Sequence, residues 1–293
     1  MSPTINEYEA PTGAIHTLIK AIGSGVAVAL AGLGSWGGLL YAGSANPVFL
    51  PWVVPAMATI LVVAGAYLKW GAWPRSGRAF RRQAVRLNAV SLRAFLLALA
   101  AGWSTMLCGF CLYVAHRTLA GMGGEGLLAL PHATFSSLWP GLVMAGIVAG
   151  VVEEIAFRGF IQGTVERRFG VAPAILVSGL LWAAFHLNHS YFAEEPLLWP
   201  AIFLAVATIL GMIAQRTDSL IPGIAVHAGF DCAYFLVAGL LAPRIAPIAF
   251  IESVANPQML VIAAVIAGAI ALPSWLAFFR ATRTPQGLQR GIG

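Results

Sequence analysis

The chain has 293 residues, of which 59% are hydrophobic and only 10% are charged. Because a soluble domain has about 25% charged residues, this composition excludes an ordinary soluble globular protein. The net charge of +6 raises the question of nucleic acid. The arginines lie between apolar runs, however, where they set membrane topology and predict no nucleic-acid partner.

Apolar runs long enough to cross a membrane follow one another along the whole chain. They lack the alternation of a transmembrane β-barrel, and about 20 apolar residues suffice for a helix to cross a bilayer. The sequence therefore predicts an all-α, polytopic transmembrane helix bundle of about eight spans. The predicted spans are 20–42, 48–70, 93–115, 137–165, 171–190, 197–215, 220–242 and 258–279.

Four regions are expected along the chain. Residues 1–19 form an N-terminal tail. Residues 20–118 hold the first helices and a basic loop at 72–92, which is either an amphipathic helix on the anionic leaflet or a solvated determinant of topology. Residues 137–242 form the core that carries the candidate site, and residues 258–293 hold the last helix and a basic tail.

Basic residues gather after the second, fourth, sixth and eighth spans, which end on one side of the membrane if eight spans alternate. The positive-inside rule then places both termini in the cytoplasm, and we expect a bacterial inner membrane. The polar start, MSPTINEYEAPTG, is unlike a cleavable signal peptide. The basic residues are Lys69, Arg75, Arg78, Arg81, Arg82, Arg86, Arg93, Arg167, Arg168, Arg216, Arg280, Arg283 and Arg290, whereas Arg117 lies on the opposite side.

A few ionisable residues fall inside the predicted spans. An ionisable group at mid-bilayer costs a few kcal/mol, so each one is a functional-site hypothesis. A buried ion pair that merely ties helices together is the alternative for a single Glu and Arg, but several such groups on three helices favour a site. They are Glu153, Glu154, Arg158, His186, His227 and Asp231.

The spacing of these residues suggests a division of roles. Glu154 and Arg158 are four residues apart, within pairing reach on one helix face. Glu153 is rotated by about 100° from Glu154, so we expect it to face another helix and to act as a general base. His227 and Asp231 are also four residues apart and form one polar face.

The depths of these residues in the bundle can also be compared. If the chain turns near Gly170, Glu153 and His186 both lie roughly 25 Å from the turn, at about 1.5 Å per residue. They are therefore expected at the same level. His227 lies only about 10 Å beyond Leu220, closer to the basic side, and the sequence does not say whether a kink, a tilt or a longer helix closes this gap.

Three motifs occur in order on these spans. They are E-E-x-x-x-R at 153–158, W-x-x-x-H at 182–186 and H-x-x-x-D at 227–231. Together they resemble the CAAX prenyl protease and bacteriocin-processing (CPBP) family, also called type II CAAX or Abi proteases. The resemblance covers about 137–242.

The resemblance implies an intramembrane protease fold of about eight helices and a glutamate-type mechanism. In that scheme Glu153 and His186 activate the attacking water as base and orienting partner. His227 and Asp231 stabilise the oxyanion, and Glu154 and Arg158 support the site.

Two positions depart from the pattern that the resemblance implies. Trp182 stands where Phe is usual, which reshapes the pocket. Asp231 stands where better-known eukaryotic members have Asn. Since an ionised Asp would repel an oxyanion, it must be protonated, orient His227 or help to bind a cation.

We therefore expect an intramembrane endopeptidase that hydrolyses a peptide bond of a membrane-associated protein or peptide by Glu-activated water. No cofactor is expected, although a divalent metal at Glu153, His186 and His227 is left open. His189 is a weaker site candidate. The alternatives are a non-catalytic immunity or partner-binding protein and a transporter with a buried proton relay.

Overall fold

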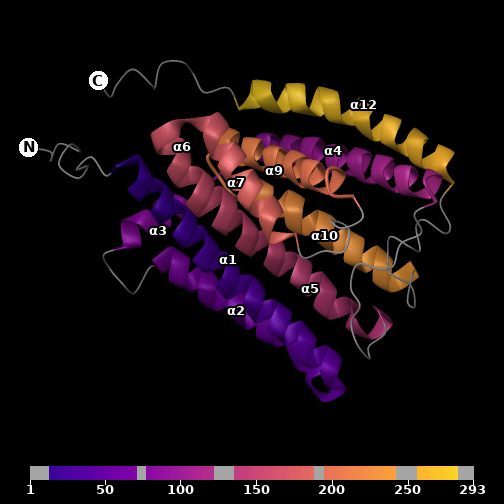
Figure 1. Cartoon of the computed structure of the whole chain (residues 1–293), viewed down its shortest axis with the longest axis horizontal. Coiled ribbons are helices and arrows are strands. Elements are labelled where there is room, and N and C mark those ends of the chain that lie inside the picture. Colours follow the sequence, from indigo (N-terminus) through magenta and orange to yellow (C-terminus); the bar gives the residue numbers. More distant parts are fainter. Residues whose placement is uncertain (1–12, 71–76, 122–134, 188–194, 242–255, 283–293) are drawn as a thin grey trace, which may run out of the picture.

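The computed structural model describes residues 13–70, 77–121, 135–187, 195–241 and 256–282, and every secondary-structure element in these ranges is a helix (Figure 1). The predicted all-α bundle is confirmed, and each predicted span coincides with a helix or a run of helices. The elements are α1 (Ala14–Ala45), η2 (Pro47–Phe49), α2 (Leu50–Trp70), α3 (Arg78–Val85), α4 (Leu92–Leu119), α5 (Phe135–Glu153), η4 (Glu154–Gln162), α6 (Gly163–Phe169), α7 (Val171–Phe185), α9 (Leu198–Thr217), α10 (Ile221–Leu241) and α12 (Pro257–Ala281).

Five of the described helices, α1, α2, α4, α9 and α12, are long and apolar enough to cross a membrane by length and composition. The shorter α7 is also apolar. It ends at Phe185, so the predicted span 171–190 is too long, and His186 caps the helix. The chain is an integral membrane protein.

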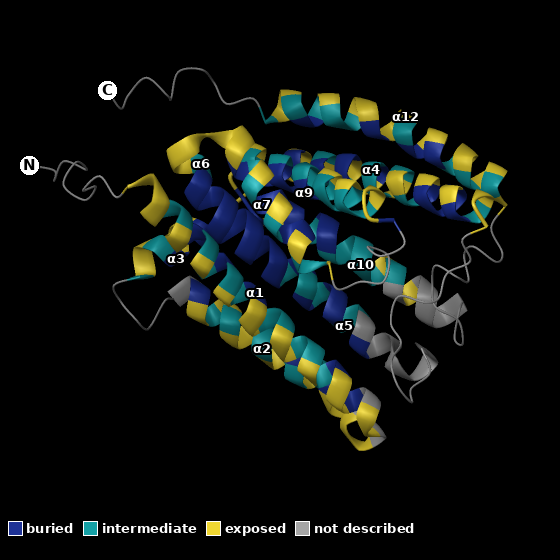
Figure 2. Cartoon of the chain, viewed as in Figure 1, coloured by how far each residue is buried: buried dark blue, intermediate teal, exposed yellow. Residues whose placement is uncertain are grey.

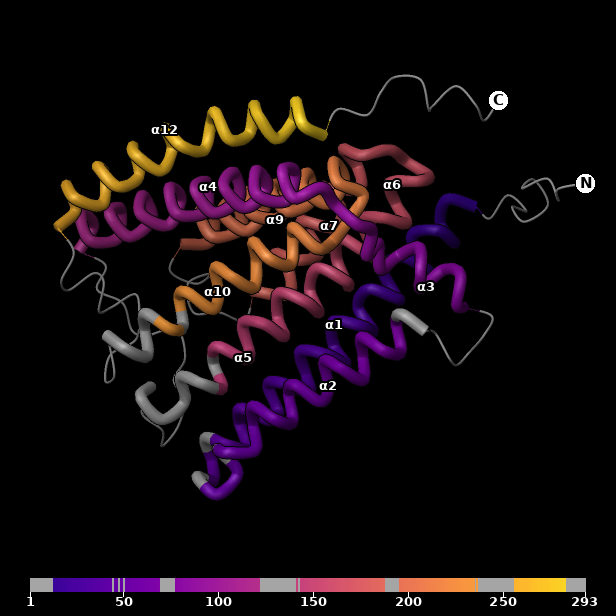
Figure 3. The backbone as a smooth tube through the Cα atoms, turned by 180° about the vertical axis from the view of Figure 1, so that it is seen from behind, coloured from indigo at the N-terminus to yellow at the C-terminus, as the bar shows by residue number. Residues whose placement is uncertain are grey.

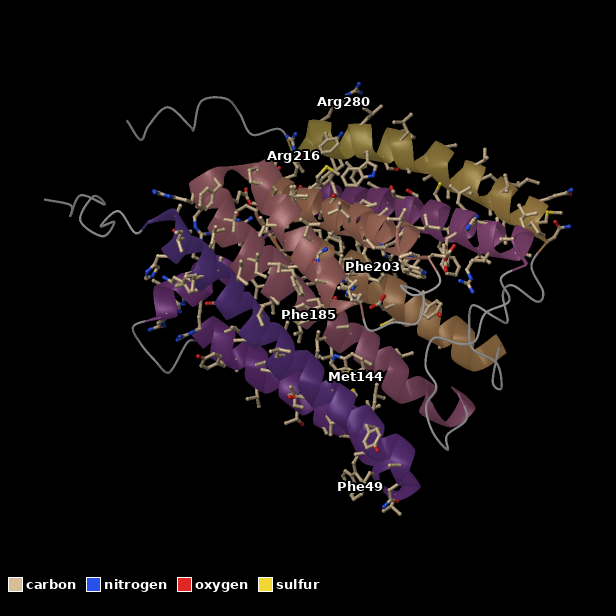
Figure 4. The ribbon with its side chains drawn as sticks, in the orientation of Figure 1. Phe49, Met144, Phe185, Phe203, Arg216 and Arg280 are labelled. Carbon is tan, nitrogen blue, oxygen red and sulfur yellow. The ribbon has the colours of Figure 1, made fainter. Side chains whose placement is uncertain are left out.

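The helices form layers around a central pair. α1 packs on α2 along one side of the bundle, α12 packs on α4 along the other side, and α5 and α10 lie together between them (Figures 1 and 3). α1 starts and α12 ends at the same end of the bundle (Figure 1). Arg216 and Arg280 lie at this end, which we call the basic end, and Phe49 lies at the opposite end (Figure 4).

The stretch 152–165, which contains η4 and the adjoining ends of α5 and α6, is the most buried part of the bundle (Figure 2). Glycines bring the other helices close to it. A Cβ atom at Gly150 of α5 would lie 2.6 Å from the backbone nitrogen of Ala228 on α10. A Cβ atom at Gly25 of α1 would lie 2.4 Å from Ile161 of η4. The glycines therefore fix the spacing of the helices that carry the polar residues.

The predicted span 137–165 is not one regular α-helix, because η4 (Glu154–Gln162) is a π-helix. Its wider turns are closed by bonds five residues apart, such as that from the Gly163 N–H to the Arg158 carbonyl. Two side-chain hydrogen bonds to neighbouring helices support it. Ser178 of α7 donates to the Phe157 carbonyl at 2.8 Å, and Gln162 donates to the Gly211 carbonyl of α9 at 2.9 Å.

The basic loop predicted at 72–92 contains the short helix α3 (Arg78–Val85), which packs on the protein. Arg81, Ala84 and Val85 are buried, and Phe80 makes an edge contact with Phe160 of η4. The segment therefore contains an amphipathic helix with one face on the protein, and the contact of its other face with the anionic leaflet stays a prediction.

A buried polar cluster joins α4 to the start of α9 at the opposite end. From the sequence, Arg117 was placed in a loop on the side opposite the other basic residues. Its side chain is only 1% exposed, and its Nη1 lies 3.5 Å from Glu195 Oε2. Tyr113 donates to Glu195 at 3.0 Å, and His116 lies 3.0 Å from its other oxygen. These contacts hold the segment before α9 against the end of α4. The sequence alone did not identify them.

Candidate active site

The polar residues predicted from the spans meet where α5, α7 and α10 come together. Glu153 is the last residue of α5, Trp182 lies on α7 and His227 lies on α10. All three are at most 5% exposed. The Trp182 indole N–H donates a short hydrogen bond to Glu153 Oε2, and that same oxygen lies 3.9 Å from His227 Nε2.

His227 is surrounded by three carboxylates. Its Nδ1 lies 3.0 Å from Glu154 Oε1, and its Nε2 lies 3.6 Å from Asp231 Oδ2 and 3.9 Å from Glu153 Oε2. Because a carboxylate accepts, Nδ1–H donates to Glu154 and fixes the orientation of the ring. Glu153 thus faces other helices, as its rotation from Glu154 led us to expect, but both carboxylates reach the same imidazole at different nitrogens.

The predicted pairing of Glu154 with Arg158 is present. Arg158 Nη1 lies 3.2 Å from Glu154 Oε1, and both side chains are almost fully buried. The contact is an ion pair without hydrogen-bond geometry, because both terminal guanidinium nitrogens have no hydrogen-bond partner among the described residues. The Arg158 guanidinium instead lies over the Trp182 ring, 4.8 Å from its centroid.

Glu154 is also confined by its surroundings. Its Oε2 has no hydrogen-bond partner in the described part of the chain. A Cβ atom at Gly223 of α10 would lie 3.1 Å from this oxygen. A larger side chain at position 223 would therefore press on the carboxylate that holds His227.

His186 joins the site through Trp182. Its Nδ1 lies 2.8 Å from the Trp182 carbonyl oxygen, and since a carbonyl only accepts, Nδ1 carries the proton. In the neutral ring Nε2 is then an acceptor. Phe203 of α9 packs on both rings, with centroids 4.3 Å from His186 and 5.0 Å from Trp182, near the centre of the bundle (Figure 4).

Trp182 has a larger part in the site than the sequence indicated. It was expected to reshape a pocket in place of Phe, whereas its N–H bonds to Glu153 and its ring contacts His186, His227 and Arg158. A phenylalanine could make the ring contacts but not the hydrogen bond. The departure from the motif was the signal that could have identified this role.

The expected difference in depth between His227 and Glu153 is not present. Leu220, just before α10, packs in one buried cluster with Phe160 of η4, so α10 starts well inside the bundle and not at the level of Gly170. His227 lies seven residues after Leu220, and Glu153 lies seven residues before Phe160. α10 and the run of α5 and η4 have opposite directions (Figure 1). His227 and Glu153 therefore reach the same level without a kink in α10.

The divalent metal left open from the sequence at Glu153, His186 and His227 stays a prediction. Within the described ranges, no group of three or more His, Cys, Asp and Glu side chains is arranged to hold a metal ion. Arg158 adds a positive charge beside Glu154, which would repel a divalent cation. His189, the weaker candidate from sequence, lies outside the described residues.

Comparison with known protein families identifies the segment that holds the site. Residues 135–233 match the model of the family described as Type II CAAX prenyl endopeptidase Rce1-like. A comparison with curated proteins and one with solved structures gave no match. The matched segment starts with α5 and ends within α10, so it contains all six predicted site residues. This segment, residues 135–233, therefore resembles the Rce1-like type II CAAX prenyl endopeptidases.

Proposed function

We propose that this protein is a glutamate-type intramembrane endopeptidase that cleaves a membrane-associated protein or peptide. The observation that carries the proposal is the buried Glu153 carboxylate beside His227, whose ring is held by Glu154. Peptide hydrolysis needs a base for water and a donor for the oxyanion, both in a site shielded from bulk water. Glu153 and His227 are the two residues whose positions suit these roles.

In the proposed reaction Glu153 takes a proton from water as the water oxygen attacks the scissile carbonyl carbon. His186 accepts the second hydrogen bond of that water through Nε2. The His227 imidazolium donates from Nε2 to the oxyanion of the tetrahedral intermediate. Glu153 then passes its proton to the leaving amine, and the carbon–nitrogen bond breaks. This sequence leaves Glu153 ionised for the next turnover.

Asp231 has a positioning role in this proposal. Its Oδ2 lies 3.6 Å from His227 Nε2, on the same imidazole that Glu154 holds from Nδ1. Three carboxylates around one ring, with one arginine nearby, favour the imidazolium form. In this proposal Asp231 stabilises the positive charge of the His227 ring and orients its Nε2 toward the oxyanion.

The basic end of the bundle is proposed to face the cytoplasm, with both termini on that side. The support is the collection of arginines there on α3, α6, α9 and α12, which the positive-inside rule assigns to the cytoplasmic side. A cysteine placed in either tail should then react with a membrane-impermeant thiol reagent only in inside-out vesicles.

Replacing Trp182 with phenylalanine should lower the cleavage rate by about 10- to 100-fold. The ring contacts remain, but Glu153 loses a donor, and a hydrogen bond to a charged group contributes about 1.5–3 kcal/mol. Trp275→Phe is the matched control, because Trp275 of α12 donates to Thr105 of α4 at 2.9 Å and to none of the site residues. Equal activity in both variants would show that the Trp182 N–H does not contribute.

Removal of metal ions is expected to leave cleavage unchanged. The reaction proposed above uses only side chains, and Arg158 opposes a cation beside Glu154. The purified protein is dialysed against a chelator and assayed in reconstituted vesicles. Loss of cleavage that returns with added zinc would contradict the metal-independent mechanism.

The proposal as a whole is tested by finding what the protein cuts. Membranes from cells that produce the wild type or Glu153→Gln are compared by quantitative proteomics of peptide termini. We expect one or more membrane-associated proteins to carry a shortened terminus only with the wild type. A non-catalytic immunity or partner-binding protein predicts identical termini and a phenotype that persists in the variant.

A further inference from the structure

A cavity of about 480 Å³ lies at the basic end of the bundle, away from Glu153 and His227. It forms where the end of α3, the last turn of α6 and the turn between α9 and α10 meet. Its volume falls in the range of small-ligand sites, about 300–1,000 Å³. The residues that line it are Arg82, Gln83, Arg86, Asn88, Glu166, Arg167 and Asp218.

Four of the lining residues contact one another, and we call this group the clasp: Arg86, Asn88, Glu166 and Asp218. Arg86 is only 7% exposed, donates to Glu166 at 3.0 Å and lies 3.9 Å from Asp218. Asn88 donates to both the carbonyl and a carboxylate oxygen of Asp218, at 2.7 and 3.0 Å. A Cβ atom at Gly163 would lie 2.8 Å from Arg86, so this glycine makes room for the guanidinium.

The charge of the lining favours an anion. Three arginines face two carboxylates, which leaves one net positive charge. Both carboxylates are already engaged inside the clasp, Glu166 by Arg86 and Asp218 by Asn88. Arg82 and Arg167 are the exposed arginines of the lining. The planar guanidinium group of an arginine can donate two parallel hydrogen bonds to the oxygens of a phosphate.

Exposed apolar side chains stand close in sequence to the lining residues, as expected for a ligand that has a hydrocarbon part. Leu87 and Leu92 follow Arg86 and Asn88 and are 50% and 72% exposed. Phe169, two residues after Arg167, is 36% exposed. The cavity also lies where α4 begins and α6 ends, at the level of lipid headgroups for a helix that crosses the bilayer. We propose that this cavity binds the phosphate group of an anionic phospholipid.

A bound headgroup would bridge parts of the chain that lie far apart in sequence. Arg82 belongs to α3 and Arg167 belongs to α6, which continues the helix run that carries Glu153 and Glu154. A ligand that binds only the folded protein raises its stability in proportion to its occupancy. Anionic lipid should therefore stabilise the bundle against unfolding. This inference does not depend on the proposed protease activity.

The test compares the unfolding temperature of the full-length protein in three settings. These are vesicles of phosphatidylcholine, vesicles that also contain phosphatidylglycerol, and phosphatidylcholine vesicles with added inorganic phosphate. The wild type should unfold at a higher temperature with phosphatidylglycerol. A stabilisation by inorganic phosphate with no further effect of phosphatidylglycerol would overturn the lipid as the occupant.

Matched double variants separate the cavity from general attraction of arginines to an anionic surface. Arg82→Gln with Arg167→Gln removes two charges from the lining. Arg78→Gln with Arg168→Gln removes two exposed arginines of the same helices outside it. The first variant should lose more than half of the temperature increase, and the second should retain most of it. Equal losses in the two variants would overturn the proposal.

Discussion

Replacing Glu153 with glutamine is expected to abolish cleavage and to leave the fold intact. Loss of a positioned general base costs about 10²–10⁴-fold in rate, and Gln keeps the size of the side chain and its acceptor for the Trp182 N–H. The variant should extract from membranes as the wild type does and unfold at a similar temperature. Gln258→Glu is the control, because this exposed side chain stands at the start of α12, outside the site.

The neighbouring carboxylate should behave differently. Glu154 is fully buried and pairs with Arg158 and His227. Removing one partner of a buried ion pair typically costs about 3–5 kcal/mol, since the other charge stays buried. Glu154→Gln should therefore lower the unfolding temperature, whereas Glu153→Gln should not. Two adjacent variants with the same loss of stability would contradict the separate roles assigned to them.

Replacing Gly150 with alanine should have the second large effect. The added Cβ atom would lie 2.6 Å from the Ala228 backbone nitrogen, and backbone cannot move aside as a side chain can. α5 and α10 must separate, which moves His227 away from Glu153 and Glu154. A displacement of about 1 Å can cost about 100-fold in rate, so we expect at least that loss in the cleavage assay, together with a lower unfolding temperature.

Gly109 of α4 provides the matched control for this prediction. No heavy atom lies within 4 Å of the position that its Cβ atom would occupy, and the residue is exposed. Gly109→Ala should therefore retain full activity. If Gly150→Ala is equally active, the close approach of α5 and α10 does not position the site.

Much of the fold and part of the site follow from the sequence, for physical reasons. Apolar length alone locates helices in a membrane protein, because each backbone polar group must be bonded internally. The Glu154–Arg158 pair followed from helical spacing, because the two residues are neighbours on one helix face. Gly170 was expected at a turn and has a φ of +85° there, a conformation that suits glycine.

The remaining features depend on contacts that one-dimensional patterns do not encode. The π-helix is supported by Ser178 and Gln162, whose bonds cross to other helices. The depth of His227 depends on where α10 starts, which the packing of Leu220 on Phe160 determines. The Trp182 N–H could be matched to Glu153 only once α5 and α7 were placed side by side.

The buried cluster around Glu195 was missed for a similar reason. Tyr113 and Arg117 lie at the end of a span, where a charge is ordinary, and their partner is 78 or more positions away. Only the folded chain shows that these charges are buried. The same holds for Arg86, whose partner Glu166 lies 80 positions along the chain.

The central claim is that Glu153 activates the water that cleaves the peptide bond. The most direct measurement is the cleavage rate of a peptide identified from the shortened termini, with purified protein in vesicles. The wild type and Gln258→Glu should cleave it at similar rates, and Glu153→Gln should show no cleavage above background. Cleavage by Glu153→Gln at the wild-type rate would contradict the account.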